Sequence, residues 1–375
     1  MLGAMGLELL YKNLVRPLLF CVDPEDSHQF AHAVARNAKP LWPLLGLQFK
    51  YSGKDLTCEV AGIRFQNPVG LAAGFDKNGD LVDILGDVGF GFAEIGSVTA
   101  QARAGNPKPR LFRLPEDQAL INRLGLNGEG ADHIADKLKK KRLSLPIGIN
   151  IAKTNDPAIV GDAAIEDMFD TFRKVRDLPL AYITVNASCP NTQEGILTET
   201  SMLATLFAQM QEANHHQLPI FVKLSPDSSR QLIEDMVSTA SKCNLAGYVI
   251  GNTTTSRGSL TTSPRVVEQI GNGGLSGQPL KKLALQLCQL VYKLKAPNQV
   301  IIGCGGISSG RDAYDFILGG ASMVQLYTGL VYEGPTLPKR INEELSDLLR
   351  ADGLSLADAV GMSLKDKTHK TALAG

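Results

Sequence analysis

The sequence predicts an α/β fold, a (β/α)8 TIM barrel with an N-terminal helical extension. Between about residues 51 and 350, short apolar segments alternate with helix-like segments, and we count eight such units, as a barrel of parallel strands requires. Polar residues recur where seven of the strands end, which is the edge at which barrels place their active sites. A doubly wound sheet is the alternative, but it usually carries Gly-x-Gly-x-x-Gly near its first strand, and none stands there. We therefore divide the chain into a helical segment, residues 1–50, and a barrel with a C-terminal tail, residues 51–375.

Bulk composition excludes several classes of protein. Lys+Arg and Asp+Glu both number 38, so the net charge is zero and no basic surface is expected to attract nucleic acid. The 6 cysteines are scattered without a Cys-x-x-Cys pair, so we expect no disulfide framework, zinc site or iron–sulfur cluster. Such cysteines are typical of a reduced, intracellular protein. No secretory signal is visible, and no apolar run reaches the roughly 18 residues of a membrane span.

Residues 1–50 are predicted to form two or three short helices. Apolar residues follow helical spacing from Leu7 to Leu18, and Asp23-Pro24-Glu25 supplies an N-cap and a first-position proline for a second helix. The apolar stretch Leu41–Leu47 is short for a core helix. The excess apolar surface favours docking on the main domain, with contact to a membrane interface as the alternative. His28 and His32 lie one turn apart without further ligands, which favours a solvated or locally bonded role over a metal site.

The barrel strands are predicted from runs of apolar and β-branched residues. A helix-like segment is expected after each strand, as at Ala131–Lys141, Ser229–Cys243 and Lys281–Lys295. The eight strand candidates are Pro68–Gly74, Phe92–Val98, Ile147–Ala152, Tyr182–Ser188, Pro219–Ser225, Gly247–Asn252, Gln299–Gly306 and Ser322–Thr328.

The fourth of these strands ends in the stretch Asn186-Ala-Ser-Cys-Pro-Asn-Thr192, which we take as the centre of the site. Its amides both donate and accept hydrogen bonds, and Cys189 is a group able to take a proton. Together they suit the recognition and deprotonation of a small polar ring. The structural alternative is an ordinary strand-to-loop junction, but polar residues at the other strand ends favour a common site.

The last two strand ends are rich in glycine. Ile302–Ile307 and Gln325–Gly329 supply backbone amides and a hydroxyl, and Gly273–Gly277 adds a further glycine-rich loop. The loops after the seventh and eighth strands are where barrels commonly bind phosphate. A phosphate there, with a ring over the barrel mouth, favours FMN, and Lys223 or Lys77 would stabilise negative charge on a flavin that accepts hydride.

Long sequence motifs stand in a recognisable order along almost the whole chain. They are Asn67–Lys77, Glu94–Thr99, Asn106–Leu114, Ile121–Asn127, Asn186–Thr192, Asn252–Thr254, Gly273–Gly277 and Gly305–Ile307. In these motifs the sequence resembles dihydroorotate dehydrogenases, the FMN barrel enzymes of pyrimidine synthesis. The N-terminal helices and the absence of cluster cysteines resemble the membrane-associated, quinone-reducing class 2 members, in which such helices form a quinone tunnel.

The resemblance implies a role for many positions. Cys189 would be the catalytic base, beside Lys77, and His28, Arg113 and Tyr327 would line the quinone tunnel. FMN would be held by Ala73, Gly74, Lys77, Ser97, Asn150, Asn186, Lys223, Gly251, Gly277, Gly306, Tyr327 and Thr328. Dihydroorotate would be held by Lys77, Asn122, Arg123, Leu124, Gly125, Leu126, Asn186, Asn191, Asn252 and Thr253.

Three departures from the family pattern bear on the electron acceptor. Cys189 stands where class 2 members carry serine and soluble class 1 members carry cysteine, Ala152–Asn155 replaces Gly-Lys-Asn-Lys, and Leu126 replaces phenylalanine. The expected reaction is oxidation of dihydroorotate to orotate, with electrons passing through FMN to a membrane quinone. The expected location is peripheral, on the cytoplasmic face of a bacterial inner membrane or on the mitochondrial inner membrane.

Other functions stay open from the sequence. One alternative is the same reaction with a soluble acceptor such as fumarate, as in class 1. Another is a flavin barrel of the dihydropyrimidine dehydrogenase or dihydrouridine synthase kind. A third is a membrane-peripheral paralogue that binds FMN without turnover.

Overall fold

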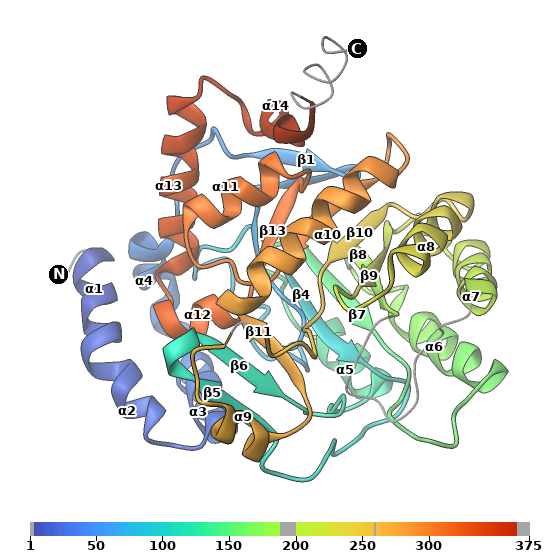
Figure 1. Cartoon of the computed structure of the whole chain (residues 1–375), viewed down its shortest axis with the longest axis horizontal. Helices are drawn as coiled ribbons and strands as arrows, with labels where there is room; N and C mark the ends of the chain where they lie inside the picture. The colour runs from blue at the N-terminus through green and yellow to red at the C-terminus, as the bar shows by residue number, and fades with distance from the viewer. Residues whose placement is uncertain (1–3, 188–199, 259, 366–375) are drawn as a thin grey trace.

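Eight parallel strands form a closed barrel in the order β10-β12-β13-β3-β4-β7-β8-β9. A computed structural model describes residues 4–187, 200–258 and 260–365, and Figure 1 shows the strands at the centre with helices around them. The fold prediction is confirmed, and a closed barrel excludes the doubly wound sheet. The barrel strands are β3 (Val69–Leu71), β4 (Phe92–Val98), β7 (Ile147–Ile151), β8 (Tyr182–Asn186), β9 (Ile220–Leu224), β10 (Gly247–Ile250), β12 (Val300–Cys304) and β13 (Met323–Leu326).

The helices of the barrel cover its outer face with apolar side chains, because both faces of a parallel sheet must be buried. In α10, for example, Ala284, Leu287, Cys288 and Val291 are buried. These helices are α5 (Ala131–Lys139), α6 (Asp162–Val175), α7 (Thr200–Glu212), α8 (Arg230–Lys242), α9 (Pro264–Ile270), α10 (Lys281–Leu294), α11 (Gly310–Leu318), α12 (Thr328–Glu333), α13 (Leu337–Ala351) and α14 (Leu356–Ala359).

The amino-terminal end of the barrel is closed by aromatic side chains. A hairpin of β1 (Cys58–Val60) and β2 (Ile63–Phe65) places Phe65 5.4 Å from Phe92, between ring centroids. Tyr182 and Phe221 continue this cluster with centroids 5.3 Å apart. The opposite end, where the strands finish, is therefore the end that has room for a ligand.

The chain departs from the prediction in two places. No regular helix follows β3, because residues 72–91 form successive turns. There the buried Asp76 carboxylate accepts the backbone N–H groups of Asp80 and Leu81, each at 2.8 Å, in place of helical carbonyls. A small antiparallel sheet of β5 (Leu111–Leu114), β6 (Ala119–Asn122) and β11 (Gly274–Gly277) was also not predicted; β11 occupies the glycine-rich loop.

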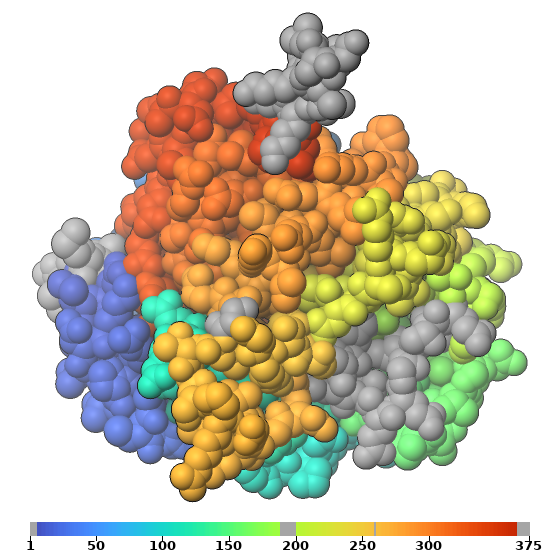
Figure 2. Space-filling model, in the orientation of Figure 1, coloured from blue at the N-terminus to red at the C-terminus, as the bar shows by residue number. Residues whose placement is uncertain are grey.

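The N-terminal segment docks on the barrel. It consists of α1 (Ala4–Leu10), a π-helical turn (Tyr11–Val15), α2 (Arg16–Phe20), α3 (Pro24–Asn37) and α4 (Trp42–Phe49). Figure 2 shows these helices in blue along one edge of the molecule, against the C-terminal part of the chain. As predicted, the Asp23 side chain caps α3. Tyr11 Oη donates to the Val331 carbonyl at 2.7 Å, and a buried ion pair joins Glu25 to Arg110 at 2.7 Å. Within the described ranges, no helix is long and apolar enough to cross a bilayer.

Candidate active site

A polar cavity of about 150 Å³ lies at the carboxyl ends of the barrel strands, as the sequence predicts. Strand ends and the loops after them supply its lining, so residues distant in sequence meet there. Most of the expected site residues line it: Ala73, Gly74, Lys77, Ser97, Asn122, Leu124, Gly125, Leu126, Asn186, Lys223, Gly251, Asn252, Thr253, Gly277, Gly306, Tyr327 and Thr328.

Two expected residues of the substrate and cofactor sites, Asn150 and Arg123, do not line this cavity. Cys189 and Asn191 lie outside the described residues. Asn150 lies beneath the cavity, inside the barrel. The Arg123 side chain turns outward: its guanidinium lies 4.6 Å from the Phe112 ring centroid and donates to the Asn272 carbonyl at 3.0 Å. The structure thus places the Arg123 guanidinium as a support for the Asn122–Leu126 loop.

Two lysines bring positive charge to the cavity. Lys223 is the penultimate residue of β9 and is 7% exposed. Lys77 follows the first barrel strand, and its ammonium donates to Asn127 Oδ1. Burial, together with the positive charge of Arg110, lowers the pKa of Lys77 to about 8. Lys77 is therefore largely protonated at neutral pH and can bind an anionic ligand.

A chain of hydrogen bonds runs from the barrel interior to the cavity. It begins at Glu94, which is fully buried and accepts from Asn150 Nδ2 at 2.8 Å. Asn150 Oδ1 then accepts from Ser97 Oγ. Ser97 Oγ accepts from Asn186 Nδ2 at 3.0 Å, and Asn186 Oδ1 accepts from Asn252 Nδ2 at 3.3 Å. Because a carboxylate only accepts hydrogen bonds, Glu94 fixes which end of each amide faces the cavity.

The other oxygen of Glu94 is also satisfied by donors. Glu94 Oε2 accepts from Gln325 Nε2 at 3.0 Å, from Thr184 Oγ1 at 3.1 Å and from Tyr182 Oη at 3.3 Å. Because Nε2 of Gln325 faces the carboxylate, its Oε1 points away from Glu94. This oxygen is buried and has no hydrogen-bond partner among the described residues. Gln325 and Thr253, whose Oγ1 is also buried and unpaired, both line the cavity. Such atoms indicate a site built for a ligand with donors and acceptors of its own.

A cradle of glycines lies on the far side of the cavity. Gly277 has φ +99°, and a Cβ on it would lie 2.3 Å from the Gln118 carbonyl oxygen. A Cβ on Gly306 would lie 2.7 Å from Lys281 Cβ, and one on Gly329 would lie 2.4 Å from the Ile307 carbonyl oxygen. No side chain fits at these three positions, so backbone is presented to the cavity, beside the Thr328 hydroxyl at the start of α12. Backbone of this kind suits a phosphate group.

A second, apolar cavity of about 350 Å³ lies between the N-terminal helices and the barrel. His28, Arg113 and Tyr327, the residues expected to line a quinone tunnel, all lie on its wall. The two cavities share Tyr327, Leu111 and Leu120. Tyr327 is half-buried, and desolvation of its hydroxyl raises the pKa to about 12, so the hydroxyl stays protonated.

Comparison with known proteins identifies the family. The family model described as "Dihydroorotate dehydrogenase" matches residues 55–349. The chain belongs to the dihydroorotate dehydrogenase family. A relative from Roseiflexus castenholzii named "Dihydroorotate dehydrogenase (quinone)" is 42% identical over 365 residues, covering 94% of this chain and 97% of that protein. One of the same name from Halobacterium salinarum is 41% identical and covers 94% and 99%.

Solved structures agree with this membership. The crystal structure of the Eimeria tenella dihydroorotate dehydrogenase in complex with ferulenol superimposes with a TM-score of 0.81 at 32% identity, over 91% of this chain and 95% of that one. The ligand-free Eimeria tenella enzyme gives 0.80 at 31% identity, over 91% and 99%. Dihydroorotate dehydrogenases depend on a flavin, and this chain aligns with the quinone-type members over nearly its whole length.

Sequence reasoning missed three polar residues of this candidate site. Asn127 holds the Lys77 ammonium, and Glu94 and Gln325 form the buried end of the hydrogen-bond chain. A signal for the last two was present, because each is a polar residue inside an apolar strand run, Phe92–Val98 and Met323–Leu326. The unusual Ala152–Asn155 stretch lies beside the cavity: Asn155 Nδ2 donates to the Gly125 carbonyl at 3.1 Å.

Proposed function

We propose that this protein oxidises dihydroorotate to orotate, a step of pyrimidine (UMP) biosynthesis, with FMN as its cofactor and a membrane quinone as electron acceptor. One observation carries the proposal: a polar cavity and an apolar cavity share a wall at Tyr327, Leu111 and Leu120. A polar pyrimidine in the first cavity and an apolar quinone in the second would thus reach opposite sides of this shared wall. One cofactor bound at the wall would accept electrons from the first and give them to the second.

The polar cavity offers the groups that dihydroorotate needs. Lys77 supplies a positive charge for the substrate carboxylate, and the amides of Asn122, Asn186 and Asn252 supply donors and acceptors for its ring. We assign Asn191 to the same set on the resemblance alone. The Asn122–Leu126 loop, which the outward-facing Arg123 side chain supports, lines the same cavity.

FMN fits the remainder of the cavity. The glycine cradle at Gly277, Gly306 and Gly329, with Thr328, would hold the phosphate, and Lys223 and Ser97 would contact the ring. The unpaired Gln325 Oε1 and the neighbouring strand ends offer partners to ring nitrogen and oxygen atoms. When bound, FMN supplies the acceptor for the hydride that leaves C6 of dihydroorotate.

Cys189 is proposed to remove the proton from C5 of the substrate. A thiol has a reference pKa of about 8.5, so it takes part in proton transfer near neutral pH far more readily than serine. Asn186 and Lys77, which flank the cavity, would hold the ring while the C5 proton leaves. The protonated Lys77 would keep the substrate carboxylate in place throughout.

The N-terminal segment is proposed to contact the membrane surface. Thirteen large hydrophobic side chains are exposed in the described part of the chain, and eleven of them lie between residues 9 and 47. Three of these side chains, Val15, Phe30 and Val34, also line the second cavity, so a quinone would enter it directly from the lipid. The proposed location is peripheral, on the cytoplasmic face of the inner membrane in a bacterium or on the mitochondrial inner membrane in a eukaryote.

The proposal is tested by mixing the purified yellow protein with dihydroorotate under anaerobic conditions and following flavin absorbance. Rapid bleaching is expected, and re-oxidation by a short-chain quinone should follow. Cys189 favours a second acceptor, fumarate, so both acceptors are added in parallel to the reduced protein. Failure to bleach a flavin that dithionite reduces would remove dihydroorotate as substrate, and re-oxidation by fumarate alone would overturn the quinone assignment.

A further inference from the structure

Two histidines of α3 form a polar corner of the apolar cavity. The rings of His28 and His32 have centroids 4.3 Å apart, and both line the cavity. His28 Nε2 bonds to the Phe75 carbonyl oxygen at 2.9 Å. His32 Nε2, in contrast, is buried without a hydrogen-bond partner among the described residues. A buried, unpaired ring nitrogen is costly unless it serves a ligand, a water molecule or a proton.

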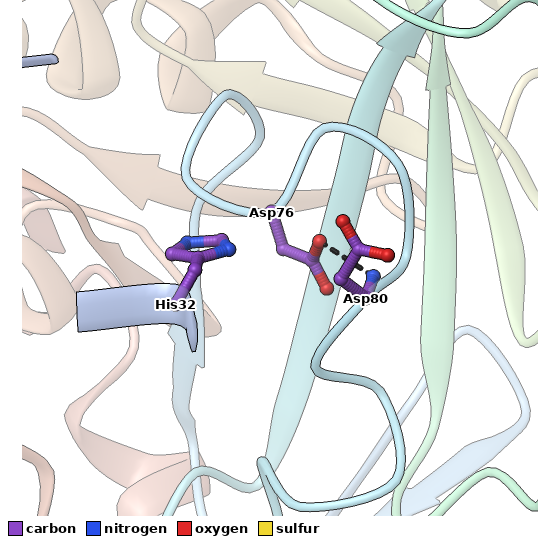
Figure 3. Close-up of side chains that lie close together, drawn as sticks. All are labelled: His32, Asp76 and Asp80. Atoms are coloured by element: carbon purple, nitrogen blue, oxygen red, sulfur yellow. Dashed lines mark hydrogen bonds between the residues drawn. The ribbon is translucent and has the colours of Figure 1, made fainter. Parts of the chain in front are cut away.

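Two carboxylates connect His32 to the surface. A ring nitrogen of His32 and an oxygen each of Asp76 and Asp80 all lie within 4.8 Å of one another. Figure 3 shows Asp76 between the His32 ring and Asp80. Asp76 is 0% exposed, whereas the Asp80 side chain is 26% exposed. The cluster therefore leads from solvent, through a buried carboxyl group, to the wall of the apolar cavity.

The cluster has the donor types of a metal site, but its carboxylates are already engaged. Both oxygens of Asp76 accept backbone N–H groups at 2.8 Å. Asp80 pairs with Lys137 at 3.0 Å, and Arg36 lies 4.0 Å from it. These cations offset the negative charge that would attract a divalent ion. A proton, which needs no free coordination position, suits the cluster better.

The proposed reaction requires a proton in the apolar cavity. A quinone that becomes a quinol gains two electrons and two protons. A hydride equivalent from the reduced cofactor carries two electrons and one of these protons. The second proton has to come from water through the protein, because the cavity wall is largely apolar.

We propose that His32 gives this second proton to a quinone oxygen and that Asp76 and Asp80 return a proton to His32 from solvent; this inference rests on the quinone-reducing function proposed above. As the N–H bond of His32 breaks and the O–H bond of the quinol forms, Asp76 gives its proton to the other ring nitrogen, so the imidazole stays neutral throughout. Asp80 with bulk water then restores the proton on Asp76. Any gap beyond hydrogen-bond reach is spanned by one water molecule.

The electrostatics of the cluster agree with this route. Burial raises the pKa of Asp76 to about 6, so a fraction of its carboxyl groups holds a proton near neutral pH. Burial lowers the pKa of His32, which keeps the imidazole neutral and able to accept a proton on one nitrogen and donate from the other. The titratable and charged groups that face these two side chains are His28, Arg36, Lys77, Asp80 and Lys141.

The test compares His32→Ala with the wild type in re-oxidation of the reduced, FMN-loaded protein by a short-chain ubiquinone. We expect re-oxidation to slow on the order of 10²-fold, the usual contribution of a positioned acid. Added imidazole should restore much of the rate, because it supplies the missing acid in the cavity left by the side chain. His216→Ala, which removes an exposed histidine 60% accessible to solvent, is the matched control and should re-oxidise normally.

Three further readouts separate a proton role from a binding role. Quinone affinity, measured by flavin fluorescence, should be unchanged in His32→Ala, and the wild-type re-oxidation rate should fall in D₂O while that of the variant does not. Asp76→Asn should weaken the pH dependence of re-oxidation. An unchanged rate in His32→Ala, or a slow rate with weakened quinone affinity and no rescue by imidazole, would overturn the relay. If quinone failed to re-oxidise even the wild type, the proposed function would fall instead.

Discussion

Replacing Glu94 with glutamine tests whether one buried carboxylate sets the hydrogen-bond pattern of the substrate cavity. The carboxylate accepts four hydrogen bonds, one through Oε1 and three through Oε2. Glutamine has the same shape as glutamate, but one of its two terminal atoms is an NH₂ donor in place of an oxygen acceptor. Placing this NH₂ at the Oε1 position opposes one hydrogen bond, that from Asn150, whereas placing it at the Oε2 position would oppose three. With the NH₂ at the Oε1 position, the Asn150 amide has to rotate so that its oxygen faces the new donor.

The reversal would pass along the chain of hydrogen bonds. With Asn150 turned, Ser97 becomes the donor to Asn186, and Asn186 presents Nδ2 where it presented Oδ1 to Asn252. A hydrogen bond lost or opposed between buried groups costs about 1–3 kcal/mol, which corresponds to about 5- to 150-fold in affinity. We therefore expect orotate to bind to Glu94→Gln more weakly by a factor in that range.

Titration of orotate into the oxidised protein, followed through the flavin spectrum, measures this loss at equal flavin content. Thr184→Val is the matched control, because it removes one donor to Glu94 without reversing any amide. Its orotate affinity should stay close to that of the wild type. Wild-type affinity in a folded, flavin-loaded Glu94→Gln protein would refute the reasoning.

Three other predictions concern the base, the charge and the apolar cavity. Cys189→Ala should lose on the order of 10²-fold or more in the rate of flavin reduction by dihydroorotate, measured by stopped flow; a rate near wild type would contradict its role as base. Because the pKa of Lys77 lies at about 8, the ammonium loses its charge above that pH, and the affinity for orotate should fall by about tenfold per pH unit there. An orotate affinity that stays constant above pH 8 would contradict the binding of the orotate carboxylate by Lys77. Ala31→Trp, on the wall of the apolar cavity, should slow re-oxidation by quinone about tenfold or more while flavin reduction persists. Gln29 is exposed on the same helix and does not line the cavity, so Gln29→Trp should leave the rates of flavin reduction and re-oxidation unchanged. Equal re-oxidation rates in the two variants would contradict quinone entry through this cavity.

The barrel was predictable because each of its strands is an apolar run buried on both faces. All eight predicted strands are present, and their bounds differ from the prediction by a few residues at the ends. The turns at residues 72–91 were not predictable from periodicity, because a single buried carboxylate, Asp76, organises them. The strands of the small sheet were missed since four residues are too few to show an alternating pattern.

Site residues that stand at a strand end were predictable from the sequence. Residues whose role depends on the direction of the side chain, or on how a helix docks, were less predictable. Asn186, Lys223 and Thr328 were placed at the cavity by strand position alone. The outward turn of Arg123 depends on contacts with Phe112 and the Asn272 carbonyl, which come from distant parts of the chain. The closeness of His32 to Asp76 was equally invisible, because it depends on how α3 docks on the barrel.

The shared wall at Tyr327 has a consequence for the steady-state kinetics. Because the linings of the two cavities have only Tyr327, Leu111 and Leu120 in common among the described residues, orotate and quinone would not exclude one another, and each would be released to its own phase, water or lipid. Orotate should thus leave the Michaelis constant for quinone untouched. The N-terminal helices that would select the type of quinone contribute no residue to the lining of the polar cavity. A lineage that changes its respiratory quinone can therefore remodel residues 1–50 and keep its pyrimidine chemistry intact.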